Sequence, residues 1–139
     1  MQKNEHVLGI IPARHSSSRL PNKNMREICG KPLIAYTIEQ ALASSLIDET
    51  VLISDISDIP KLAKQYGVRA IKEPDELSQG NVPGMKLIRY VLNTLQGEGQ
   101  YQIDVVAFLQ PTSPLRKVQH IDEALDLFLK SDADSLASL

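Results

Sequence analysis

The N-terminal part of the chain contains Val7-Leu8-Gly9-Ile10-Ile11, a continuous apolar run that ends at Pro12. A strand in a parallel sheet has this composition because helices cover both of its faces. A short β-branched run at residues 50–54 predicts a second strand, and residues 68–71 and 104–109 predict two more. Residues 134–139 alternate like the start of a fifth strand. The chain is therefore expected to contain several short strands of one sheet.

Amphipathic stretches separate these runs. Residues 32–44 begin with proline, and Ile34, Ile38 and Leu42 stand four apart, which predicts a helix with one apolar face. Three more helices are expected over the apolar stripes at residues 59–63, 88–95 and 121–128. Ser57 or Asp58 can cap the first of these helices, and Gly67 can end it. Strict alternation of strand and helix predicts a three-layer α/β/α fold with a mostly parallel sheet. Ligands of such sheets gather at the carboxyl ends of the strands.

Length and composition fit one intracellular domain. The chain has 139 residues, 42% of them apolar, and a formal net charge of -2. No run approaches the roughly 18 apolar residues of a membrane span. The charge balance gives no reason to bind nucleic acid. Cys29 is the only cysteine, which excludes an internal disulfide and fits a reducing compartment. Together these features predict a soluble cytoplasmic protein without a nucleic-acid or membrane partner.

The connection between the first strand and the first helix carries the strongest chemical signal. It is long compared with the roughly two to six residues usual in α/β loops. It holds three cations, three consecutive hydroxyls and two amides: Arg14, Arg19, Lys23, Ser16, Ser17, Ser18, Asn22 and Asn24. Such groups at a strand's carboxyl end suit a polyphosphate, although the same composition also fits a solvated basic loop. The spacing of a Walker P-loop is absent.

Two blocks of sequence are distinctive. The first runs from Ile10-Ile11-Pro12-Ala13-Arg14 through Ser17 and Leu20-Pro21-Asn22-Lys23-Asn24 to Gly30-Lys31-Pro32-Leu33-Ile34-Ala35-Tyr36-Thr37-Ile38. The second is Leu109-Gln110-Pro111-Thr112-Ser113-Pro114-Leu115-Arg116. Both blocks resemble the acylneuraminate cytidylyltransferase family, the enzymes that make CMP-sialic acid. The resemblance implies a Rossmann-like fold of the nucleotide-sugar transferase type. It also implies that residues 1–139 form the nucleotide-binding portion of one cytidylyltransferase domain, which is expected to be incomplete at its C-terminus.

The resemblance also implies an activity. The anomeric hydroxyl of an acidic nine-carbon sugar would attack the α-phosphorus of CTP and release pyrophosphate, with Mg²⁺ as the metal and a homodimer as the full-length assembly. The implied catalytic residues are Lys23 and Arg14. The implied nucleotide-binding residues are Ala13, Arg14, Ser17, Lys23, Asn24 and Gln110, with Arg19, Lys72, Thr112 and Ser113 as secondary candidates.

The chain departs from the family pattern at several places. Glu73 stands where the family has a nucleotide-contacting arginine, with Lys72 beside it. The second block lacks the metal-binding aspartate of the related KDO cytidylyltransferases, which favours a sialate-type substrate. No carboxylate pair has a convincing metal spacing, so no metal ligand is assigned, and the chain alone is expected to be inactive. The alternative is a non-catalytic relative, or a fragment, that keeps only the phosphate loop.

Overall fold

The computed structural model describes residues 6–13, 27–28, 31–56, 58–74, 84–97, 103–109 and 118–130. Within them lie six strands and four helices, in the order β1 (Val7–Ala13), β2 (Glu27–Ile28), β3 (Lys31–Pro32), α1 (Leu33–Ala43), β4 (Glu49–Ser54), α2 (Ile59–Tyr66), β5 (Arg69–Lys72), α3 (Gly84–Gln96), β6 (Val105–Phe108) and α4 (Val118–Lys130). None of these helices is both long enough and apolar enough to cross a bilayer.

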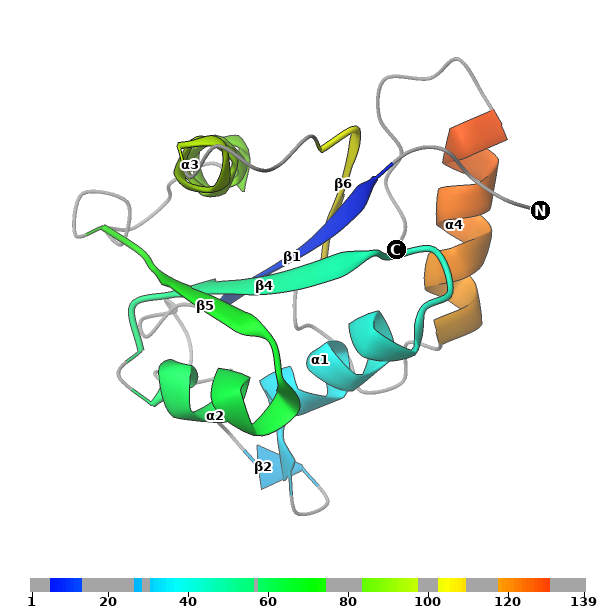
Figure 1. Cartoon of the computed structure of the whole chain (residues 1–139). Coiled ribbons are helices and arrows are strands. Elements are labelled where there is room, and N and C mark those ends of the chain that lie inside the picture. Colours follow the sequence, from blue (N-terminus) through cyan, green and yellow to red (C-terminus); the bar gives the residue numbers. More distant parts are fainter. Residues whose placement is uncertain are drawn as a thin grey trace.

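Four strands form one parallel sheet in the order β5-β4-β1-β6. Figure 1 shows α3 on one face of this sheet and α1, α2 and α4 on the other. The three-layer α/β/α fold with a parallel sheet is therefore confirmed. The first apolar run is its centre, since β1 pairs with β4 on one side and β6 on the other.

Side chains along β1 alternate between two cores, as strand geometry requires. Leu8 and Ile10 pack with α3 residues such as Leu87 and Val91. Ile11 packs with α1 and α2 residues, and Val7 packs with α4 residues. Both faces of the strand are fully buried, which is why its sequence is apolar at consecutive positions.

The predicted helices form, with two corrections to their details. In α1 the buried face is made by Ile34, Ile38 and Ala41, whereas Leu42 is 48% exposed. The spacing of four residues drifts around a helix of 3.6 residues per turn, so Leu42 has rotated off the sheet. Asp58 occupies the N-cap position of α2, but its side chain makes no capping hydrogen bond.

The predicted helix stop at Gly67 is confirmed. Gly67 ends α2 in the left-handed conformation, with φ of 72°, and its N–H donates to Lys64 O. Glycine suits this position because a Cβ would strain that backbone conformation. The predicted fifth strand at residues 134–139 and the alternative cap Ser57 lie outside the described residues.

Two local features were not predicted from the sequence. The connection after β1 contains a small antiparallel hairpin, in which Ile28 of β2 pairs with Lys31 of β3. Helix α3 begins at Gly84, one turn before its apolar stripe at Ile88. The hairpin is the more important difference, because it stands where the long polar connection reaches α1.

Candidate functional site

The two sequence blocks singled out above leave neighbouring strands at one edge of the sheet. From β1 the chain steps outward to β4 and β5, and α3 then carries it back to β6 on the other side of β1. The boundary between β1 and β6 is thus the point where the strand order reverses, and open α/β sheets bind ligands at this point. Leu109 N, at the end of β6, donates to Ile10 O of β1 at 2.8 Å. The sequence expectation that both unusual loops follow carboxyl ends is confirmed.

The last residues of three strands form a row along this edge. In the register of the ladder, Ala13 of β1 is level with Ser54 of β4, and Ser54 is level with Lys72 of β5. Ser54 is 4% exposed, and its hydroxyl oxygen accepts a hydrogen bond from Ile56 N at 2.9 Å. Glu73 N donates to Ser54 O at 2.8 Å, which continues the ladder past β5. The edge is therefore held by backbone pairing.

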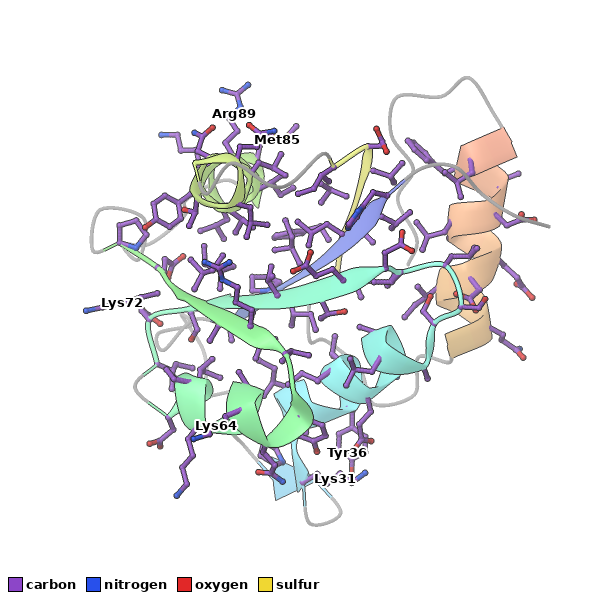
Figure 2. All side chains as sticks on the ribbon, viewed as in Figure 1. Lys31, Tyr36, Lys64, Lys72, Met85 and Arg89 are labelled. Carbon is purple, nitrogen blue, oxygen red and sulfur yellow. The ribbon has the colours of Figure 1, made fainter. Side chains whose placement is uncertain are left out.

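Lys72 and Glu73 have opposite environments although they are adjacent in sequence. Lys72 is exposed, and Figure 2 shows its ammonium pointing away from the end of β5. Glu73 is 1% exposed. Alternation assigns Lys72 to the face of Ala70, which packs toward α1 and α2, and Glu73 to the face of Ile71, which packs toward α3. Lys72 is thus an accessible cation at this edge, and the carboxylate beside it is inside the protein.

Of the predicted site residues, Ala13 and Lys72 fall within the described ranges. Ala13 is 1% exposed and its side chain belongs to the core, so only its backbone is suited to contact a ligand. The other predicted residues lie outside the described residues: Arg14, Ser17, Arg19, Lys23, Asn24, Gln110, Thr112 and Ser113. What the structure supplies is the pair of strand ends from which these residues follow.

A polar cluster that the sequence did not reveal joins the hairpin to the helix layer. Lys31 Nζ donates to Glu39 Oε1 and to Glu39 Oε2, each at 2.9 Å. The Tyr66 hydroxyl donates to Glu39 Oε2 at 3.2 Å. Lys31 Nζ also lies 5.3 Å from the centroid of the Tyr36 ring, within cation–π range. No sequence spacing signals these contacts, since Lys31, Glu39 and Tyr66 belong to three different elements.

The contacts of this cluster favour its protonated forms. The hydrogen bond to Glu39 raises the pKa of Lys31, which is a surface group. Partial burial, followed by the hydrogen bond to Glu39, raises the pKa of Tyr66. Near neutral pH the ammonium and the phenol therefore both act as donors to one carboxylate.

Carboxylates at the opposite, amino-terminal edge have structural partners. Asp104 Oδ2 accepts from His6 N at 2.8 Å, and Asp48 Oδ2 accepts from Val7 N at 2.7 Å. Within the described ranges, no three His, Cys, Asp or Glu side chains gather in a way that could hold a metal ion.

Comparison with known proteins gives consistent results. A family model described as cytidylyltransferase matches residues 8–139. The chain is 35% identical over 122 residues to N-acylneuraminate cytidylyltransferase of Escherichia coli O18:K1:H7, covering 88% of this chain and 28% of that protein. It is 37% identical over 130 residues to pseudaminic acid cytidylyltransferase of Campylobacter jejuni, covering 93% of this chain and 56% of that protein.

A solved structure shares the fold. CMP:2-keto-3-deoxy-manno-octonic acid synthetase complexed with CTP superposes with a TM-score of 0.74 and 24% identity, over 89% of this chain and 47% of that one. The chain thus spans about half the length of that structure, and between 28% and 56% of the two relatives above.

Proposed function

Because the chain belongs to the cytidylyltransferase family, we propose that it forms the nucleotide-binding part of an enzyme that transfers CMP from CTP to a sialic-acid-like nonulosonic sugar. The names of the relatives support this substrate class, since they act on acylneuraminic and pseudaminic acids. The proposed setting is the cytoplasm, and the proposed full-length assembly is a homodimer.

One observation carries the proposal. The two sequence blocks of the family leave β1 and β6, which are adjacent parallel strands at the reversal point of the sheet. Neighbouring parallel strands lie about 4.8 Å apart, and Ile10 of β1 is level with Phe108 at the end of β6, so both strands run toward the same side of the sheet. Groups that come from both loops can then bind one ligand at this edge.

The proposed chemistry is a phosphoryl-group displacement. The anomeric hydroxyl releases its proton to solvent as its oxygen forms a bond to the α-phosphorus. The bond from that phosphorus to the bridging oxygen of the β-phosphate breaks, and pyrophosphate leaves with that oxygen. Lys23 and Arg14 would neutralise charge on the phosphates, with Ser17, Asn24 and the Ala13 backbone as further contacts. Gln110, Thr112 and Ser113 would follow β6 at the same site, and Arg19 and Lys72 would add positive charge.

Mg²⁺ remains part of the proposal as an ion bound through the phosphates of the nucleotide, as is usual for this cation. The described residues do not supply a site for it, since they contain no cluster of three ligand side chains. The chain spans 28% to 56% of the two relatives, and we propose that these residues alone are inactive.

A specific observation favours a second candidate, a nucleotide-binding relative without catalytic activity. Glu73 stands at the position of a family arginine and is 1% exposed at the binding edge. A buried carboxylate cannot replace a guanidinium that contacts a nucleotide. The two candidates differ in selectivity, because an enzyme must prefer CTP whereas a phosphate-binding relative need not.

Calorimetry with CTP, UTP and GTP in the presence of Mg²⁺ tests the proposal. We expect CTP to bind most tightly, and Arg14→Ala or Lys23→Ala to weaken its binding about tenfold or more, because each removes a charged hydrogen bond. Arg89→Ala is the matched control, since Arg89 is exposed on the outer side of α3 (Figure 2). Unchanged affinity in both loop variants would refute the assignment, and equal binding of all three nucleotides would favour the second candidate.

A further inference from the structure

We propose that Lys31, Glu39 and Tyr66 form a positioning cluster, which holds the β2–β3 hairpin against the helix layer and so fixes the chain where the phosphate-binding segment ends. The inference deepens the proposed function, because it assumes that residues 14–24 contact the triphosphate. None of the three residues is proposed to touch the nucleotide itself.

The hairpin needs such support because it is very short. Each of its strands has two residues, and an isolated two-stranded ribbon is marginal in water even when it is longer. Lys31 lies in β3 and donates to both carboxylate oxygens of Glu39 in α1. The Lys31 ammonium thus contacts both oxygens of one carboxylate and ties the hairpin to α1.

Tyr66 extends the cluster to a third element. Its hydroxyl donates to Glu39 Oε2, so α2 also contacts the carboxylate that binds Lys31. The Tyr36 ring lies beside the same ammonium and favours its charged form. Glu39 is thus orientated by two donors from different elements, and a positioning role requires such a fixed acceptor.

The location of the cluster explains how it would act. The polar segment is attached to the sheet at Ala13, which is held by the ladder to β4. Its other end is Glu27, which pairs with Pro32 beside Lys31. A chain segment that is fixed at both ends has fewer available conformations than one fixed at a single end, so binding of a ligand by such a segment costs less entropy.

The cluster is separated from the binding edge. Figure 2 shows Lys31 and Tyr36 together at the outer side of the helix layer, whereas Lys72 marks the end of β5 at another corner of the molecule. Its influence on a nucleotide must therefore pass through the chain.

Two measurements on the 139-residue chain test the inference. Hydrogen exchange without nucleotide should show faster exchange of the Ile28 and Lys31 amides in Lys31→Met and in Tyr66→Phe, with β5 unchanged. Calorimetry should show that the same changes weaken CTP binding about threefold to fivefold, which is the energetic scale of an exposed ion pair. The affinity for CMP should fall less. In Lys31→Arg, hairpin amide exchange and CTP affinity should both match the wild type, since arginine also donates to both oxygens of a carboxylate.

The control is Lys64→Met. Lys64 is an exposed lysine of α2 for which the described part of the chain shows no ion pair. We expect it to leave hairpin exchange and CTP affinity unchanged. The inference is overturned if exchange of the hairpin in Lys31→Met matches the wild type, or if CTP affinity falls equally in Lys31→Met and Lys64→Met. A wild-type chain that binds no CTP would instead refute the proposed function, and the exchange measurement would still decide whether the cluster holds the hairpin.

Discussion

Replacing Asp122 by alanine should detach α4 from the turn that follows α1. The Asp122 carboxylate accepts hydrogen bonds from the Ser44 hydroxyl, from Ser45 N at 3.2 Å and from the Ser45 hydroxyl at 3.1 Å. The Ser44 oxygen in turn accepts from Leu46 N and Ile47 N, each at 3.2 Å. One side chain on α4 thus holds the first two residues of the connection between α1 and β4.

The expected loss of stability follows from these contacts. A hydrogen bond contributes about 0.5–1.5 kcal/mol net, and more when one partner is charged. Two of the three bonds to Asp122 are solvent-exposed, which places each of them near the lower end. The sum is about 2 kcal/mol, or about 6–8 °C in Tm for a chain of this length.

Thermal and urea unfolding of Asp122→Ala measure this loss. Glu123→Ala is the matched control, because Glu123 is the next residue of the same helix and is exposed. Ser44→Ala should cost less in the Asp122→Ala background than in the wild type, since the two residues share a bond. Equal stability of Asp122→Ala and Glu123→Ala would refute the reasoning, and so would full additivity with Ser44→Ala.

Two further predictions concern the first strand and the hairpin cluster. Gly9→Ala should destabilise the fold by about 1–2 kcal/mol in urea unfolding, because the new Cβ would lie 3.2 Å from Ile47 Cγ2. The loss of stability should be smaller in an Ile47→Ala background. An equal loss in both backgrounds would contradict this cause. The Tm difference between the wild type and Lys31→Met should be constant from about pH 7 to 9 and should decrease as the pH rises above 10.5. The folded-state pKa of Lys31 is raised, so the ion pair stabilises the fold fully below the ordinary lysine pKa, and this stabilisation is lost as the pH rises through the folded-state pKa. A Tm difference that persists unchanged at pH 11.5 would argue against the ion pair.

The parallel sheet could be predicted because its strands are short, β-branched and apolar on both faces. In β4 every residue from Thr50 to Ser54 is buried, so period-two alternation is absent and a continuous run replaces it. Gly67 could be predicted as a helix stop for a similarly local reason, since few other residues adopt its backbone conformation. These features depend on neighbours in the sequence, and local patterns describe them well.

Features that depend on register or on distant partners could not be predicted. Leu42 fits the apolar stripe of α1 by spacing, but the orientation of the helix on the sheet decides that Ala41 faces inward instead. The strand register similarly decides that Lys72 faces solvent and that Glu73 is buried. The hairpin depends on a lysine whose partner lies eight residues away on another element. In each case the deciding contact is tertiary.

The elements that follow the two loops of the proposed site are both tied to α1 or to its following turn, and this links the stability predictions to function. One loop lies between β1 and the hairpin, the other lies between β6 and α4, and a single carboxylate makes each tie. Glu39 holds the hairpin through Lys31, and Asp122 holds α4 through Ser44 and Ser45. Both anchors converge on α1, which packs against the centre of the sheet. Loss of either carboxylate contact should therefore weaken nucleotide binding while the sheet persists, whereas a change at Gly9 should weaken binding only in step with global stability.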